Sequence, residues 1–158
     1  MTTAFMFYDV VLAIHILAVV IAFGVVFAYP VMDAVLKGQG VELAALHRLH
    51  VALATRFIQP AMAVVLLAGV YLALDRWSLG DPWISATFAI LIALFALTGA
   101  VLIPTDRRMA ELAERDAEAG GAPSADYLAE ERRAALFGSI ALLLVVIAVF
   151  VMTLKPGA

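Results

Sequence analysis

Residues 7–32 read FYDVVLAIHILAVVIAFGVVFAYPVM, and this stretch decides the fold. Between Asp9 and Asp33 the only residue of the Asp, Glu, Lys, Arg or His type is His15. A helix rises about 1.5 Å per residue, so about 20 apolar residues cross a hydrocarbon core about 30 Å thick. No Lys or Arg precedes Lys37, and the apolar run exceeds the roughly 7–15 residues of a signal peptide. We therefore expect a retained membrane span.

Three further stretches have the length and apolar character of a span, namely 57–74, 83–103 and 134–154. The 158-residue chain is 65% hydrophobic and 15% charged, whereas a soluble domain is about 45–50% apolar and about 25% charged. The sequence therefore predicts an all-α fold with one membrane domain over residues 1–158. We expect an integral membrane four-helix up-and-down bundle with a charged cytoplasmic helical hairpin.

Composition excludes several classes of function. The chain has no cysteine, which excludes disulfides, thiolate zinc sites and iron–sulfur clusters. A net charge of -3 provides no basic field for nucleic acid. The partner that composition does predict is the lipid bilayer.

Positive charge predicts the orientation of the spans. The connections 33–56 and 104–133 carry eight of the ten Lys and Arg residues, and Arg76 and Lys155 are the other two. Because Lys and Arg accumulate on the cytoplasmic side, both connections should be cytoplasmic and both termini outside. We expect a multi-pass protein of the bacterial inner (plasma) membrane.

The two long connections have helical patterns of their own. Val41–Ile58 carries leucines at three- and four-residue steps, which indicates that the second span extends into the cytoplasm as an amphipathic helix. The connection 104–133 has mixed charges around Gly120, which indicates a helical hairpin. We expect Thr105 or Asp106 to cap its first helix and Ser124 or Asp126 its second.

His15 is the sharpest candidate for chemistry, because an ionisable group inside a span is costly and normally faces the bundle interior with a partner. A neutral imidazole can ligate haem iron, bind copper or relay protons. Alternatively, His15 is a structural residue hydrogen-bonded to a helix carbonyl or to the hydroxyl of Thr87 or Tyr71. Residues alone leave both alternatives open.

Depth limits what His15 can ligate within one chain. It lies about eight residues, or about 12 Å, from the outer end of its span, and no other span contains a histidine. Met62 and Gln59 lie near the cytoplasmic end of the second span and Met152 near the outer end of the fourth. We expect none of these three at the depth of His15. A haem would then need an imperfect second ligand or a His15 pair across a homodimer.

His47 and His50 form an H-x-x-H on the amphipathic stretch. Residues three apart share a helix face, so the pair is a weak candidate for a transition-metal site. Because no clear third ligand is nearby in sequence, we favour an interfacial polar face.

Asp33 and Asp106 lie at span ends, where we expect solvated carboxylates. Gly24, Gly69 and Gly99 lie in three spans and are expected to allow close helix approach. We interpret the cytoplasmic arginines as the orientation signal, and they are Arg48, Arg56, Arg107, Arg108, Arg132 and Arg133.

Several short motifs resemble those of a known family. They are I-H-I-L-A from Ile14, R-F-I-Q-P-A-M from Arg56, L-L-A-G-V-Y-L-A-L from Leu66, I-P-T-D-R-R from Ile103 and M-T-L-K-P-G from Met152. Over nearly its whole length the chain resembles a bacterial four-helix family described only as predicted integral membrane proteins. It is more distantly similar to HemJ-type protoporphyrinogen oxidases and to the copper-resistance D membrane domain. The HemJ likeness implies haem b as cofactor, with His15 as its ligand.

Two functional hypotheses follow. In the first, the protein is a non-enzymatic accessory or assembly partner of a larger membrane complex, because no polar constellation converges within the spans. The alternative is a haem b-binding redox protein that acts on a porphyrin or porphyrinogen, with His15 as axial ligand. The sequence does not decide whether the protein is an enzyme, or whether it forms a homodimer.

Overall fold

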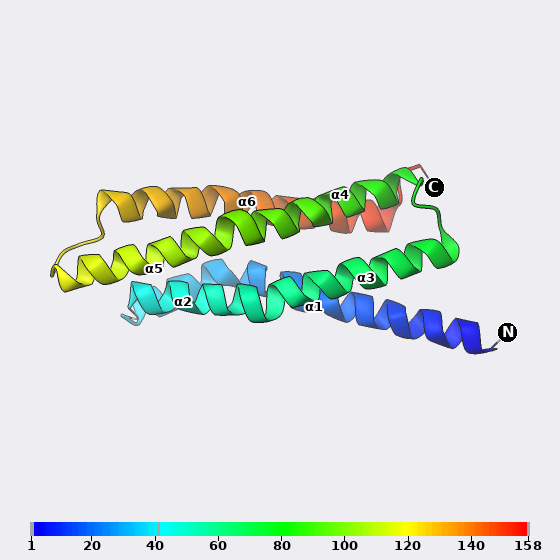
Figure 1. Ribbon diagram of the computed structural model, residues 1–158, viewed down its shortest axis with the longest axis horizontal. Coiled ribbons are helices and arrows are strands. Elements are labelled where there is room, and N and C mark those ends of the chain that lie inside the picture. Colours follow the sequence, from blue (N-terminus) through cyan, green and yellow to red (C-terminus); the bar gives the residue numbers. More distant parts are fainter. Residues whose placement is uncertain (1, 41, 158) are drawn as a thin grey trace.

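The computed structural model describes residues 2–40 and 42–157, and these form four long helical rods joined by turns (Figure 1). Each rod contains a helix long and apolar enough to cross a membrane, as the sequence predicts. The described residues include no strand. The elements, in chain order, are α1 (Thr2–Gly38), α2 (Leu43–Leu53), η1 (Ala54–Ile58), α3 (Gln59–Arg76), α4 (Pro82–Leu97), η2 (Thr98–Leu102), α5 (Ile103–Glu118) and α6 (Ala125–Leu154).

The rods lie along one common axis (Figure 1). Helix α1 packs along α3, α2 along α5, and α4 along α6. Both chain ends and the turn after α3 lie at one end of the bundle, which we call the terminal end. The turn after α1 and the loop between α5 and α6 lie at the other, which we call the hairpin end. The predicted all-α membrane bundle is confirmed.

The second and third rods each contain one π-helical turn, and each turn is followed by a proline. Helix η1 ends at Ile58, two residues before Pro60, and η2 ends at Leu102, two residues before Pro104. Proline has no N–H to donate, and its ring clashes with the carbonyl four residues earlier. A wider turn accommodates that clash without breaking the helix.

The connections at the hairpin end are mostly continuations of the membrane helices. Residues 43–76 and 82–118 are each one uninterrupted rod, so the predicted helical extension of the second span is confirmed, with Val41 outside the described residues. The predicted cap at Thr105 or Asp106 is wrong, because no helix begins there. Ser124 does cap α6, and its hydroxyl accepts a hydrogen bond from the Tyr127 amide at 3.3 Å.

The buried core is divided along the axis of the bundle. Small residues such as Ala18 and Ala22 pack against Met62 and Val65 in the membrane half. A second cluster joins the rods at the hairpin end, and it consists of Ala44, Met109, Leu112, Ala113 and Tyr127. A third cluster, of Ala73, Trp83 and Ile84, lies toward the terminal end. Many other large apolar side chains are exposed, as expected of helix faces that contact lipid.

Packing at the hairpin end gives a matched pair of substitutions on neighbouring residues. Ala44 is fully buried, whereas Ala45 is exposed. We expect Ala44→Leu to lower the free energy of unfolding by about 1–3 kcal/mol, because the extra carbons have no space. Ala45→Leu should leave it within about 0.5 kcal/mol. Circular dichroism during thermal unfolding in mild detergent measures both, and equal midpoints for the two variants would contradict the observed packing.

Candidate functional site

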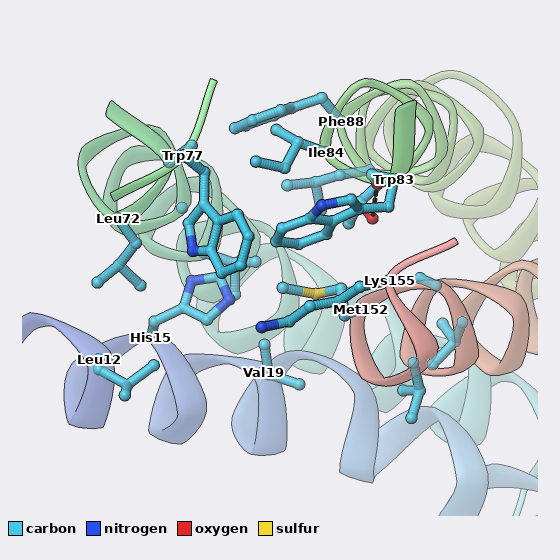
Figure 2. A pocket seen from close by; sticks show the side chains of 18 of the residues that line it. Leu12, His15, Val19, Leu72, Trp77, Trp83, Ile84, Phe88, Met152 and Lys155 are labelled. Atoms are coloured by element: carbon cyan, nitrogen blue, oxygen red, sulfur yellow. Dashed lines mark hydrogen bonds between the residues drawn. The ribbon is translucent and has the colours of Figure 1, made fainter. Parts of the chain in front are cut away.

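His15 lies on α1 and faces a partly enclosed cavity of about 260 Å³ near the terminal end. All four rods contribute to the wall of this His15 cavity, which is mostly apolar. Its lining includes Leu12, Val19, Gly69, Leu72, Trp77, Trp83, Ile84, Phe88, Leu91, Met152 and Lys155 (Figure 2). The prediction that His15 faces the bundle interior is therefore confirmed for the described residues.

The His15 ring is buried, and neither of its nitrogens makes a hydrogen bond within the described part of the chain. The carbonyl of Val65 lies near the ring, but the contact does not have hydrogen-bond geometry. The Thr87 hydroxyl donates to the Trp83 carbonyl at 2.7 Å, and the Tyr71 ring packs against Phe7. The predicted hydrogen bond to the Thr87 or Tyr71 hydroxyl is therefore wrong, whereas the Val65 carbonyl near the ring is a partner of the kind that the helix-carbonyl alternative names.

A glycine makes room for the His15 ring. A Cβ atom added at Gly69 would lie 3.4 Å from His15 Cε1, and a larger side chain would enter the same space. Gly99 similarly accommodates Gln59, whose amide nitrogen would be 3.2 Å from an added Cβ. An added Cβ at Gly24 would meet nothing within 4 Å, so the predicted close approach there is wrong.

Met152 and Lys155 extend from the end of α6 into the same cavity (Figure 2). Met152 therefore lines the same cavity as His15, which residue counting along the spans did not predict. Counting residues from each span end assumed that the spans start in one plane, whereas α1 extends beyond the end of α6 (Figure 1). Gln59 and Met62 do not line this cavity.

Aromatic rings cover the terminal end of the His15 cavity. The Trp77 and Trp83 rings meet edge to face with centroids 5.2 Å apart. The Lys155 ammonium lies 4.4 Å from the centre of the Trp77 ring and 5.4 Å from that of Trp83. The indole nitrogen of Trp83 is buried and has no hydrogen-bond partner in the described residues. An apolar cavity with unpartnered nitrogens and one cation is suited to an amphipathic ligand.

A second site lies at the hairpin end, where His47, His50 and Asp106 come together. His47 Nδ1 lies 3.1 Å from Asp106 Oδ1, and His50 Nδ1 lies 3.5 Å from the same oxygen. The groups of these three residues that can ligate a metal all lie within 4.8 Å of one another. We call these three residues the His–Asp cluster.

The other nitrogen of each imidazole also has a partner. His50 Nε2 lies 2.9 Å from Asp33 Oδ1 on α1, and His47 Nε2 lies 3.0 Å from the Tyr127 hydroxyl on α6. The His50 ring also packs against the Tyr29 ring, with centroids 4.5 Å apart. Both rings are thus held in orientation from two sides.

Burial at the His–Asp cluster corrects two predictions. His47 and His50 are only 4% and 7% exposed, so the predicted interfacial polar face is wrong. Asp106 and Asp33 are partly buried and bonded to imidazoles, so they are not simply solvated carboxylates. Asp106 is the third member of the cluster, and sequence spacing did not identify it. One signal was available, because the H-x-x-H and Asp106 both lie just beyond the hairpin-end limits of neighbouring spans.

A cavity of about 410 Å³ adjoins the His–Asp cluster, and we call it the His50 cavity. The two π-helical turns contribute to its wall through Ala54, Ile58 and Thr98. The two cavities also share lining residues, namely Phe23, Leu94 and Val145. The bundle interior therefore contains two adjoining spaces, of which the one at the hairpin end is the more polar.

Residues 9–156 match a family described as "Predicted integral membrane protein (DUF2269)". The chain belongs to this family. The match confirms the resemblance that covers nearly the whole sequence, and both candidate sites lie within it. None of the curated proteins and none of the solved structures matches the chain. The more distant likenesses to protoporphyrinogen oxidases and to the copper-resistance domain stay predictions.

The His–Asp cluster should stabilise the hairpin end through Asp106. We expect Asp106→Ala to lower the free energy of unfolding by about 1–3 kcal/mol, because two buried imidazoles lose their shared acceptor. The matched control is Glu111→Ala on the same helix, whose exposed ion pair with Arg108 at 3.8 Å should contribute less than about 1 kcal/mol. Thermal unfolding of chelator-treated protein compares the two variants. An equal loss of unfolding free energy in both would contradict this role of Asp106.

Proposed function

We propose that this member of the family binds haem b in the His15 cavity, with His15 as an axial ligand. The observation that carries the proposal is the buried His15 ring, which faces a cavity and has no hydrogen bond within the described residues. A buried polar group without a partner is costly, and an ionisable one inside a membrane is more so. A metal that accepts the lone pair of the ring satisfies one of its two nitrogens and so reduces that cost.

Three further side chains fit a haem. The Met152 thioether enters the same cavity from another helix, and a His–Met pair is an established axial set for haem iron. Lys155 provides a cation for a propionate at the end where the cavity meets the membrane surface. Trp77 and Trp83 offer flat apolar faces at that end.

The size of the cavity limits how the ligand lies. Its volume of about 260 Å³ is slightly below the roughly 300–1,000 Å³ of typical small-molecule sites. A tetrapyrrole is wide, so it would extend past Phe23 and Leu94 toward the His50 cavity, which shares these two residues. Haem would supply one-electron redox chemistry. The distant HemJ likeness favours a porphyrinogen as the substrate class.

Haem binding is tested on protein purified in mild detergent from cells supplied with a haem precursor. We expect a Soret band and one haem per chain by pyridine haemochrome, both lost in His15→Ala. Met152→Leu should retain the haem but convert a six-coordinate spectrum into a five-coordinate one, because the thioether is removed. Met32→Leu is the matched control, since Met32 lines neither cavity, and its spectrum should not change.

Two results would overturn the haem proposal. One is full pigment in a folded His15→Ala variant. The other is colourless, monodisperse wild-type protein that does not take up added haemin. The second result would favour the other hypothesis, an accessory or assembly partner of a membrane complex, and would direct the search to co-purifying proteins.

We also propose the orientation that positive charge favours, with both termini outside the bacterial inner membrane. The support is the eight-to-two distribution of Lys and Arg between the hairpin end and the terminal end. At the hairpin end, two of these Lys and Arg side chains form ion pairs, Lys37 with Glu131 and Arg48 with Glu114. In this orientation the His–Asp cluster faces the cytoplasm and the His15 cavity faces outward.

The absence of native cysteine makes orientation easy to test. Single cysteines are introduced at two exposed positions, Leu79→Cys in the turn after α3 and Ala122→Cys in the loop after α5. We expect a membrane-impermeant maleimide to label position 79 in intact spheroplasts, and position 122 only after the membrane is permeabilised. The reverse pattern would contradict the proposed orientation.

A further inference from the structure

We propose that His47, His50 and Asp106 bind a divalent transition-metal ion at the hairpin end of the bundle. This site is separate from the His15 cavity and does not depend on haem binding. Imidazole and carboxylate are the ligands that zinc, iron and related divalent ions take in proteins. Two histidines three apart on α2 and one carboxylate on α5 provide a three-ligand set of that kind.

The distances between the donor atoms suit one ion. In a tetrahedral zinc site the ligands lie about 2.0–2.1 Å from the metal, so neighbouring ligand atoms are about 3.3–3.4 Å apart. Asp106 Oδ1 lies 3.1 Å from His47 Nδ1 and 3.5 Å from His50 Nδ1. These two distances match neighbouring ligands within a few tenths of an ångström. The ligand atoms of all three residues lie within 4.8 Å of one another, so binding of one ion would also draw the two imidazoles together.

Each imidazole has a polar partner on the side away from Asp106, and that of His50 is of the usual kind for a metal ligand. A histidine that binds a metal usually donates its other ring N–H to a carboxylate, a carbonyl or a water, which fixes its orientation. His50 directs Nε2 to the Asp33 carboxylate at 2.9 Å. His47 directs Nε2 to the Tyr127 hydroxyl at 3.0 Å. Both Nδ1 atoms are thereby turned toward Asp106.

The hydrogen-bond partners of His50 require either an added proton or a metal ion between His50 and Asp106. An ionised Asp33 carboxylate only accepts hydrogen bonds, so the proton of a neutral His50 must be on Nε2. The lone pair on Nδ1 then faces Asp106 Oδ1 at 3.5 Å, and two acceptors face each other. Either a second proton on His50 or a metal ion between the two atoms resolves this contact. The first alternative makes the cluster a buried salt bridge, and experiment separates the two.

The surroundings leave space at the proposed metal. The His50 cavity, about 410 Å³, is lined by all three ligands and by polar groups that include Lys37 and Ser139. Metal sites with three protein ligands keep an open position for water or another small ligand. Here such a position would face the His50 cavity.

The test uses chelator-stripped protein in mild detergent, titrated with Zn²⁺ by calorimetry and with Co²⁺ by visible absorption. We expect one ion per chain with micromolar or tighter affinity, together with a tetrahedral cobalt spectrum. The variants His47→Asn, His50→Asn and Asp106→Asn should each weaken binding at least 100-fold. Asp33→Asn and Tyr127→Phe should weaken it about 10–100-fold at unchanged stoichiometry, because they remove only the outer partners.

Three controls keep the result interpretable. Circular dichroism and gel filtration establish that each variant is folded. Glu42→Gln changes an exposed carboxylate beside the same helix and should bind zinc as wild type does. His15→Ala should also bind zinc normally even if it loses haem, which distinguishes failure of this proposal from failure of the proposed function. Absence of stoichiometric binding, or wild-type affinity in folded Asp106→Asn, would overturn the metal site and leave a protonated salt bridge.

Discussion

The Asp106 carboxylate joins all four helical rods through two imidazoles. His47 and His50 bring the second rod to it, and Asp106 itself belongs to the third. Behind the imidazoles, Asp33 comes from the first rod and Tyr127 from the fourth. These polar contacts lie beside the apolar cluster that packs at the hairpin end. Because they join side chains from all four rods at fixed positions, they favour one register of the rods there.

The two candidate sites differ in how their imidazoles are partnered, although the Tyr29 hydroxyl beside the His50 ring has no hydrogen-bond partner among the described residues. At the hairpin end each imidazole nitrogen of the cluster faces a polar group, and charged residues surround it. At the terminal end His15 and the Trp83 indole are buried without partners among the described residues. A satisfied network favours one rigid arrangement. An unsatisfied one is stable only where something else fills the space or where function justifies the cost.

Much of the fold could be predicted from local properties of the sequence. Apolar length identifies the four spans, leucine spacing identifies the extension before Phe57, and Ser124 behaves as the N-cap that its residue type suggests. Each of these depends on neighbours in the chain. His15 is also identified locally, because an ionisable residue in an apolar run stands out.

The residues that contact or share a cavity with the predicted site residues could not be predicted, because they come from distant parts of the chain. Met152 reaches the His15 cavity because of an offset between helices that no local pattern records. Asp106 reaches His47 across 59 positions. A helix start at Thr105 or Asp106 was a reasonable interpretation of residue type, but Pro104 lies instead behind a π-helical turn within a continuous rod. Tertiary packing overrides the local signal there.

The π-helical turns set the rotational phase between the two halves of each rod. Five residues of η1 separate the histidines of α2 from the membrane part in α3. An α-helix turns about 100° per residue, so the gain or loss of one residue in this segment rotates His47 and His50 away from the bundle interior. Insertions elsewhere in a bundle lengthen a helix or a loop. Here one added or deleted residue in η1 would change which face of the second rod carries the two histidines.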